Sequence, residues 1–473
     1  TLFRSELTTL ILSHAPEASV YFNGLTAIER PENFRHRLFQ VNTKNDLEDL
    51  PTTWGGYDKF PVRSKFFLSL GKPVVAMSGK FHTAWGEFGG FKLPEAIRFE
   101  AASMISFGAS CNFGDQLHPS GVMDPSTYAN IGHAYEYVEK IESLGVGGTP
   151  AASLGLWLTA DLAADEGAAR MLLEEQIDFD VVGEETDLAG FQTIVVPSTP
   201  GALKKSQSLD AFLSRGGSLV FLGAGCLDES GNEPVIDIGA SYEGPGRYDV
   251  DYTESVDYTE SADSSGMVGG GLPTTPFLNY AAAHRFEVEE SQAEIRGRIY
   301  EPYFSRTYGS YCGHQNTANR TAPAPHPAVW RFESHLVFAH DLDRMYYAHG
   351  AYVHRALFSA ELRRIHTAPM LDVDLPSAGR VSLLHQPDKR RYVAHLLYGP
   401  PIQRGRCEVI EDLPTLTAVS VRLKLPQQIV SVRLEPAGLD LRFSAKPGEN
   451  GGEATIETAV PSFSCHCAVV CSY

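Results

Sequence analysis

The sequence predicts an α/β protein whose C-terminal part is built from strands alone. Up to about residue 365, short apolar runs alternate with segments of helical periodicity, as expected of parallel strands joined by helices. From Arg380 onward, short alternating strands are separated by turn residues such as Pro387-Asp388, which is typical of a small β-sandwich. A Gly-rich stretch from Gly145 to Pro150 divides the α/β part in two. We therefore expect three domains, covering residues 1–145, 150–368 and 370–473.

Length and charge bound the class of protein. A chain of 473 residues suffices for two or three domains of roughly 150 residues each, and 43% hydrophobic residues support sizeable cores. The 39 Lys and Arg against 58 Asp and Glu give a net charge of −19, which argues against nucleic-acid or anionic-membrane partners. No apolar run has the length of a membrane span, and no signal-like stretch follows Thr1.

The cysteines predict neither a metal site nor a disulfide framework. There are seven, an odd number, and they form no paired C-x-x-C sets. Cys465, Cys467 and Cys471 alternate along the last predicted strand, where core thiols are a simpler interpretation than metal ligands. We expect a cytoplasmic protein that needs no metal or other cofactor.

The first domain is predicted to be part of a (β/α)8 TIM barrel. About four strand–helix units fit before residue 145, whereas a whole barrel needs eight units and about 250 residues. The segment therefore has the pattern of the second half of a barrel, and its first half is not in this chain. The expected strands are Ala18–Phe22, Val74–Met77 and Cys111–Phe113, with Phe39–Val41 as a further candidate. The expected helices are Phe3–Ser13, Tyr57–Leu70, Pro94–Ser106 and one capped by Asp124.

The second domain is predicted to be flavodoxin-like, with a doubly wound sheet. A further helix is expected over Leu342–Ile365. Cys226, which follows Gly223–Gly225, could be an amidotransferase nucleophile, but no strand–Cys–helix elbow surrounds it. The expected strands are Ser153–Leu158, Phe179–Val182, Thr193–Val196 and Ser218–Leu222, and the expected intervening helices are Gly167–Glu175 and Ser208–Ser214.

Two segments of this domain stand out. The hexamer V-D-Y-T-E-S occurs twice in tandem, over 250–255 and 256–261, and predicts an acidic, solvated insert near 250–270. Arg296 to Arg320 is dense in aromatic and basic residues without a helical or strand period, which favours a long functional loop.

Polar and aromatic residues follow two successive predicted strands of the first domain. In a barrel, the loops after the strands carry the chemistry. Any one of these residues alone could be a cap or part of a turn, but together they have the side chains that bind sugar hydroxyls and stack on a sugar ring. They are Lys80, His82, Trp85 and Glu87 in the first loop and Asp115, Gln116 and His118 in the second.

Five motifs carry a resemblance to a known family. They are L-E-D-L-P at 47–51, W-G-G-Y at 54–57, G-K-F-H-T-A-W-G-E-F-G-G at 79–90, G-D-Q-L-H-P at 114–119 and E-P-Y-F-S-R-T-Y at 301–308. With the order of the domains, they resemble microbial glycoside hydrolases that have a β-galactosidase-type trimerisation domain, in the branch related to α-L-fucosidases. The motifs are specific for the superfamily and not for a substrate.

The resemblance implies an α-L-fucosidase-like or β-galactosidase-like enzyme that acts on small glycosides or oligosaccharides. It also implies a mechanism that retains the anomeric configuration and uses two carboxylates about 5 Å apart. It implies an Asp nucleophile at the end of the fourth barrel strand. Our strand count places that position before Thr1, so the chain departs from the family pattern there. Glu48 is the first candidate for the acid/base and Glu87 the second, although either could be a surface carboxylate.

The resemblance also suggests roles for other residues. Trp54 and Trp85 could stack on the sugar, and Asp115 could bind a hydroxyl or orient a partner. Lys80, His82, Gln116 and His118 are further candidates for binding hydroxyls. A homotrimer is expected, in which Tyr303, Arg306 and His314 either reach a neighbouring barrel mouth or brace their own.

Two other classes of function remain open. The absence of the nucleophile favours a non-catalytic carbohydrate-binding or assembly protein, and Cys226 would suit an amidotransferase-like hydrolase.

Overall fold

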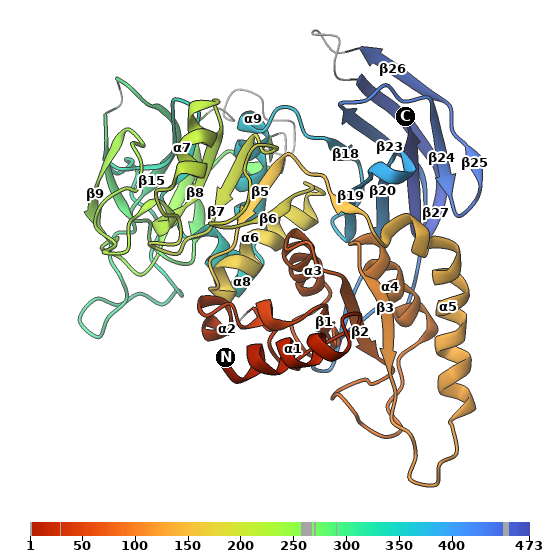
Figure 1. Ribbon diagram of the computed structural model, residues 1–473. Helices are drawn as coiled ribbons and strands as arrows, with labels where there is room; N and C mark the ends of the chain where they lie inside the picture. Colours follow the sequence, from red (N-terminus) through yellow and green to blue (C-terminus); the bar gives the residue numbers. More distant parts are fainter. Residues whose placement is uncertain (1, 29, 257–266, 269–270, 290, 448–453) are drawn as a thin grey trace. The chain divides into compact units, whose positions relative to one another are not determined.

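The computed structural model describes residues 2–28, 30–256, 267–268, 271–289, 291–447 and 454–473 (Figure 1). Its fold is mixed α/β, as predicted. It separates into two compact units, of which one contains residues 1–152, 173–181 and 368–473, and the other contains residues 153–172 and 182–367. Most of the acidic insert expected near 250–270 lies outside the described residues.

The first unit contains a small parallel sheet at its N-terminal end. Among the described residues, the sheet has three strands, β1 (Asn45–Glu48), β2 (Val74–Gly79) and β3 (Ser110–Gly114), in that order. Because side chains alternate along a strand and the strands are parallel, residues in register share a face. Glu48 is paired with Met77, and Met77 with Asn112, so these three side chains lie in one row.

Helices alternate with these strands, as in the predicted strand–helix units (Figure 1). Asp124 caps the longest of them, since its carboxylate accepts a hydrogen bond from the Ser126 amide at 3.0 Å and Pro125 is the first helical residue. The expected N-cap is thus confirmed. The helices are α1 (Leu2–His14), α2 (Pro31–Arg35), η1 (Leu38–Val41), α3 (Lys59–Ser69), α4 (Pro94–Ser106) and α5 (Pro125–Gly145).

The first strand was predicted in the wrong place. Ala18–Phe22 has no regular secondary structure, and Leu38–Val41 is a 3-10 helix. The strand is Asn45–Glu48, inside a polar stretch that gives no apolar run. Asn45 and Asp46 are nevertheless buried, so tertiary packing decides the conformation of this segment. The three strands are also fewer than the four units expected.

Most residues of a doubly wound sheet belong to the second unit. The strands β5 (Leu154–Trp157), β6 (Asp180–Val182), β7 (Thr193–Val196), β8 (Ser218–Leu222) and β17 (His335–Phe338) lie in the order β6-β5-β7-β8-β17. This is the 2-1-3-4-5 order of flavodoxin-like sheets. Helices α6 (Leu162–Glu174) and α7 (Gln207–Ser214) connect strands of this part.

Four antiparallel strands extend this sheet beyond β17, namely β16 (Pro327–Phe332), β15 (Glu294–Tyr300), β10 (Asp251–Ser255) and β13 (Phe277–Asn279). The segment expected to be a functional loop from Arg296 therefore begins as strand β15, and its irregular part starts after Tyr300. The remaining elements of the unit are η2 (Gly223–Cys226), β9 (Ala240–Gly244), β11 (Met267–Val268), β12 (Leu272–Pro273) and β14 (Arg285–Val288).

The helix predicted over Leu342–Ile365 is two helices, α8 (Leu342–His349) and α9 (Tyr352–Ile365). Gly350, with φ 58°, ends the first of them in the left-handed conformation that glycine adopts without strain. The apolar periodicity continues across this break, which is why it did not reveal the break.

The C-terminal strands are connected through one long strand. The first half of the long strand β27 (Ala454–Ser472) pairs with β23 (Thr415–Leu425) and β26 (Phe443–Pro447), and its second half pairs with β20 (Arg391–Tyr398) and β24 (Ser431–Glu435). Both halves contribute to one core, in which Cys467 and Cys471 are buried as expected. The other elements are β18 (Leu371–Val373), β19 (Gly379–Gln386), η3 (Pro387–Lys389), β21 (Ile402–Arg404), β22 (Cys407–Val409) and β25 (Leu439–Asp440).

The Gly-rich stretch expected to be a linker ends in a strand. β4 (Thr149–Pro150) pairs with β19 through His385 and Leu384. No helix among the described residues is long and apolar enough to cross a membrane.

Candidate functional site

Lys80 and Asp115 meet at the carboxyl ends of two neighbouring strands. They follow Gly79 and Gly114, which are in register at the ends of β2 and β3. The Lys80 Nζ lies 3.5 Å from the Asp115 Oδ1, and only 5% and 14% of the two side chains are exposed. The Lys80 Nζ also lies 4.8 Å from the centroid of the Phe91 ring. The pair therefore presents a fixed donor and acceptor beside an aromatic wall.

Two tryptophans stack beside this pair. The rings of Trp54 and Trp85 have centroids 6.0 Å apart and planes at 29°. Trp85 packs closely on Gly114, where an added Cβ would lie 2.9 Å from the indole. Trp54 is 37% exposed and offers ring surface to a ligand. An aromatic face next to hydrogen-bonding groups has the chemistry of a sugar site.

Glu48 occupies the end of β1 on the face that carries Met77 and Asn112. It is half-buried, and burial raises the pKa of its carboxyl, while the Arg63 guanidinium partly offsets this shift. Arg63 also donates to the Glu48 carbonyl at 2.9 Å and so fixes the backbone. A carboxyl with a raised pKa suits a general acid near neutral pH.

Glu87 has the opposite environment. Its carboxylate accepts hydrogen bonds from the amides of His82 and Thr83 and from the Thr83 hydroxyl. Slight burial raises its pKa, but these hydrogen bonds outweigh burial and hold the pKa below its ordinary value. The Glu87 side chain thus braces its own loop and lacks the raised pKa of a general acid.

The remaining predicted residues of these loops lie at the same strand ends. Thr52 donates to the His82 carbonyl at 2.6 Å and so ties the loop after β1 to the loop after β2. Gln116 approaches Gly86, where an added Cβ would lie 2.6 Å from its Nε2. His118 is exposed and shares a 2.8 Å hydrogen bond with the Ser120 hydroxyl.

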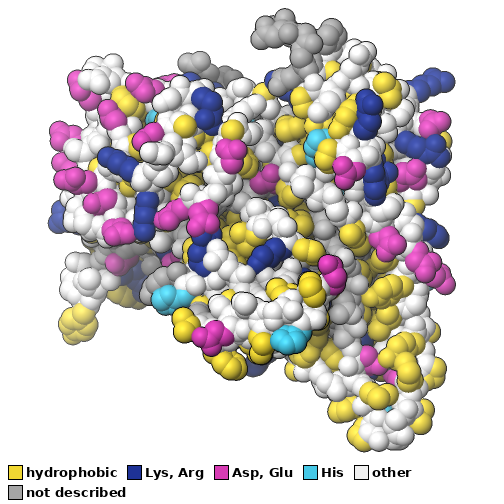
Figure 2. Space-filling model, viewed as in Figure 1, with side chains coloured by type: hydrophobic (Ala, Val, Ile, Leu, Met, Phe, Trp, Pro, Cys, Tyr) yellow, Lys and Arg dark blue, Asp and Glu magenta, His cyan; other side chains and the backbone are white. Residues whose placement is uncertain are grey.

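The loop between β3 and α5 adds an apolar rim. Figure 2 shows apolar side chains exposed at the lower right, where Figure 1 places this loop. The exposed residues include Leu117, Val122 and Met123, beside the exposed Phe88, which contacts the His118 ring.

Sequence reasoning missed Asp49, which follows Glu48. Its side chain is 3% exposed, and neither carboxylate oxygen has a hydrogen-bond partner among the described residues. Burial raises its pKa to about 6, against the influence of Arg63 and Lys59. The motif L-E-D-L-P shows two adjacent acids, and it does not distinguish the half-buried Glu48 at the end of β1 from the buried Asp49 that follows it.

Tyr303, Arg306 and His314 lie in the second unit, on the irregular segment after β15. Arg306 donates to the Gln315 carbonyl at 3.0 Å and lies 5.3 Å from the Tyr311 ring centroid. Tyr303 and His314 are exposed.

The environment of Cys226 argues against a nucleophile. The thiol is buried, donates to the Gly223 carbonyl, and has its pKa raised to about 12 by burial. A reactive cysteine needs a lowered pKa. The nearby His284 uses one ring nitrogen on Asp341 at 3.1 Å and the other on the Tyr242 hydroxyl at 3.3 Å, so it is not oriented as a base for Cys226.

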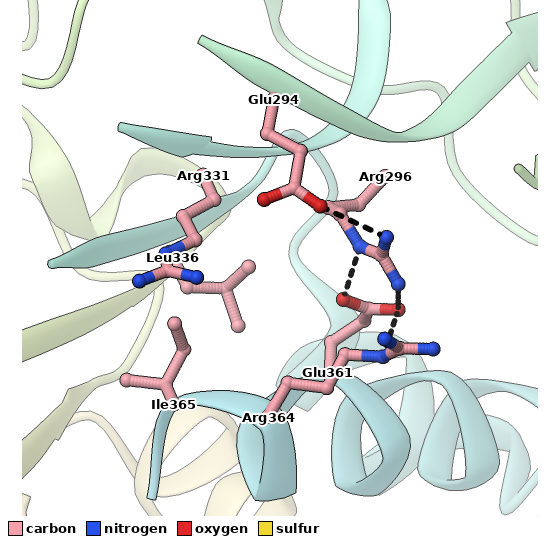
Figure 3. A pocket seen from close by; sticks show the side chains of 7 residues that line it. All are labelled: Glu294, Arg296, Arg331, Leu336, Glu361, Arg364 and Ile365. Carbon is pink, nitrogen blue, oxygen red and sulfur yellow. Dashed lines mark hydrogen bonds and ion pairs between the residues drawn. The ribbon is translucent and has the colours of Figure 1, made fainter. Parts of the chain in front are cut away.

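A pocket of about 230 Å³ lies between α9 and the strands β15 to β17, but charged side chains bonded to one another form its wall (Figure 3). Arg296 makes two hydrogen bonds to Glu361, at 3.0 and 3.2 Å, and a further ion pair with Glu294 at 3.1 Å. Arg364 lies 3.6 Å from the same Glu361. We interpret this cluster as structural. No group of His, Cys, Asp and Glu in the described part of the chain could hold a metal ion.

Asp343 should make stability depend on pH. It accepts hydrogen bonds from the Ser198 hydroxyl and amide at 2.6 and 2.7 Å, yet burial raises its pKa to about 7. The folded state therefore keeps a proton that the unfolded chain releases near pH 4, and this contribution to stability is lost as the pH rises to about 7.

In Asp343→Asn this titration is absent. The free energies of unfolding of both proteins are measured in urea between pH 4 and 8. The variant's value minus the wild-type value should increase as the pH rises to about 7, and this difference should be constant at higher pH. A difference that is independent of pH would contradict the assignment.

Solved structures of other proteins share this fold. No family model matches the chain, and no curated protein matches it. Among solved structures, it is similar to α-L-fucosidase isoenzyme 2 from Paenibacillus thiaminolyticus, with 31% identity over 99% of this chain and 71% of that one and a TM-score of 0.88. The cold-adapted β-galactosidase from Rahnella sp. R3 is 14% identical over 96% of this chain and 66% of its own, with a TM-score of 0.60. The β-galactosidase from Bacillus circulans sp. alkalophilus is 12% identical over 89% of this chain and 61% of its own, with a TM-score of 0.56.

The chain thus has a fold that this α-L-fucosidase and the β-galactosidases share, as the motifs indicated. The likeness to the β-galactosidases concerns the fold alone. At 31% identity over nearly its whole length, the chain belongs to the family of the Paenibacillus α-L-fucosidase.

Proposed function

We propose that the protein is a retaining glycosidase that acts on small α-L-fucosides. The observation that carries this proposal is the grouping of Glu48, the Lys80–Asp115 pair and the Trp54–Trp85 stack at the carboxyl ends of β1, β2 and β3. The name of the solved relative, an α-L-fucosidase, supports the choice of sugar. β-Galactosides are the second candidate substrates.

Each group has a defined task in this proposal. Glu48 protonates the glycosidic oxygen as the bond to the anomeric carbon breaks, and its carboxylate then takes a proton from the attacking water. Lys80 donates to a sugar hydroxyl and Asp115 accepts from one. Trp54 and Trp85 stack on the sugar ring, and His82, Gln116 and His118 bind outer hydroxyls. Glu87 keeps the loop in shape.

The second carboxylate comes, in this proposal, from elsewhere in a (β/α)8 barrel of which β1–β3 are part. The open face carrying Glu48, Met77 and Asn112 supports this, because the inner face of a barrel sheet is normally covered by the other strands. The chain also spans only 71% of the solved relative. Asp49 does not suit the nucleophile, since its side chain is buried.

The division into barrel, flavodoxin-like and sandwich domains belongs to the same proposal, as do a homotrimer and a cytoplasmic location. In the trimer, Tyr303, Arg306 and His314 reach the barrel mouth of a neighbour. The exposure of Tyr303 and His314 supports the trimer, and the free thiol of every cysteine supports a reducing compartment.

The test is hydrolysis of a panel of 4-nitrophenyl glycosides by the intact natural protein. We expect the α-L-fucoside to give the highest kcat/KM and the β-galactoside a lower one. Sugar binding without turnover of any glycoside in the panel would instead favour a non-catalytic carbohydrate-binding protein. If thiol alkylation leaves the turnover unchanged, Cys226 is excluded as the nucleophile.

A further inference from the structure

A hollow of about 340 Å³ lies in the second unit, on the segment that follows β15. Its walls are Glu301, Tyr303 and Arg320 and the residues from Thr321 to Pro325. A volume of this size falls at the lower end of the range of ligand pockets, about 300–1,000 Å³. Glu301 and Tyr303 of its lining belong to the motif E-P-Y-F-S-R-T-Y, and Tyr303 is also among the residues proposed to reach a neighbouring barrel mouth.

The two walls of the hollow are held together by backbone hydrogen bonds. The Arg320 amide donates to the Glu301 carbonyl at 2.8 Å, and the Tyr303 amide donates to the Ala318 carbonyl at 3.2 Å. Ala324 is anchored to strand β15, because its amide donates to the Ile299 carbonyl at 2.7 Å. Prolines at 323 and 325 further limit the backbone on one side. The hollow is therefore preformed, and a ligand would not have to order it.

An exposed aromatic ring and two charged groups line it. Tyr303 is 54% exposed, and the Arg320 guanidinium lies 5.9 Å from the centroid of its ring. The Arg320 Nε donates to the Pro302 carbonyl at 3.3 Å, which holds the guanidinium in place. Glu301 is itself held 3.6 Å from the Arg285 guanidinium.

We infer that this hollow is a second carbohydrate-binding site, specific for uncharged sugars. The ring of Tyr303 provides the apolar surface on which a sugar face stacks. Arg320 donates to hydroxyls and Glu301 accepts from them. Because one acidic and one basic side chain line the hollow, its own charge balances, and neither an anionic nor a cationic ligand gains from it. The site binds sugar without acting on it.

The test uses an array of neutral and sialylated glycans and the intact protein carrying Trp54→Ala, which weakens the proposed catalytic site. Binding of neutral glycans should persist in this background. Adding Tyr303→Ala or Arg320→Ala should weaken it about tenfold, as expected for the loss of one well-placed contact. Tyr303→Phe, which keeps the ring, should retain binding, and thermal unfolding shows whether each variant folds.

Tyr308→Ala is the matched control, because Tyr308 lies on the same segment and is fully exposed but does not line the hollow. Loss of all binding in Trp54→Ala alone, equal losses in Tyr303→Ala and Tyr308→Ala, or a preference for sialylated glycans would each overturn the inference. Arg320→Ala separates this inference from the proposed glycosidase activity, because Arg320, unlike Tyr303, has no part in the proposed catalytic site. The array measures binding and the aryl-glycoside panel measures turnover, so either proposal can fail without the other.

Discussion

Glu48→Gln should lower kcat/KM on fucosides with poor leaving groups by about 10²–10⁴-fold, the usual contribution of a general acid. Activated aryl fucosides, whose leaving groups need little protonation, should lose far less in their cleavage step. The half-buried carboxyl of Glu48, with its pKa raised chiefly by burial, is the acid of the proposed mechanism. The measurement is kcat/KM for an alkyl and a 2,4-dinitrophenyl fucoside in both proteins.

Glu87→Gln is the matched control, because Glu87 is a carboxylate of the neighbouring loop that is bound to its own backbone. It should show no such dependence on the leaving group. The general acid must be protonated, so wild-type kcat/KM should fall as the pH rises through the raised pKa of Glu48, and this limb should vanish in Glu48→Gln. Equal losses on both substrates would remove Glu48 as the acid.

Lys65→Met should cost about 3–5 kcal/mol of unfolding free energy, as expected when one partner of a buried ion pair is removed. Lys65 is 2% exposed, and its Nζ lies 3.0 Å from Asp178 and 3.6 Å from Asp180. Asp178 also accepts a hydrogen bond from the Leu383 amide, so the cluster joins α3 to β19. The substitution leaves two buried carboxylates without their cation.

Urea unfolding at pH 8 and pH 5 measures this cost. Burial already raises the pKa of Asp178, and that of Asp180 to about 7, so both carboxyls are more readily protonated in the folded state than in the unfolded chain. The destabilisation should therefore shrink as the pH falls. Lys44→Met, which removes a more exposed lysine 3.2 Å from Asp46, should cost about 1 kcal/mol or less. A cost of that size for Lys65→Met would show that the buried cluster contributes little.

Local signals predicted much of the fold. The helix Pro94–Ser106 has the predicted bounds because a proline begins it and its apolar spacing is regular. Strand β1 was missed because its polar residues are buried by contacts distant in sequence, and the pairing of β4 with β19 joins residues far apart in the chain. No periodicity within a short window contains such information.

The candidate site, like the fold, could be predicted only in part. The meeting of Lys80 and Asp115 could be predicted, because loops after neighbouring parallel strands emerge at one edge of the sheet. The difference between Glu48 and Glu87 could not, since it depends on backbone amides that turn toward Glu87 and on the depth at which Glu48 lies. The burial of Asp49 was hidden for the same reason.

The measurement that tests the central claim most directly is the NMR spectrum of the fucose that the intact protein releases from 4-nitrophenyl α-L-fucopyranoside, recorded before mutarotation. A retaining glycosidase with its site at β1–β3 should release this fucose as the α-anomer, and Glu48→Gln should slow the deglycosylation step that releases it. Release of β-L-fucose first would contradict the two-carboxylate retaining mechanism, and absence of turnover would contradict the glycosidase itself.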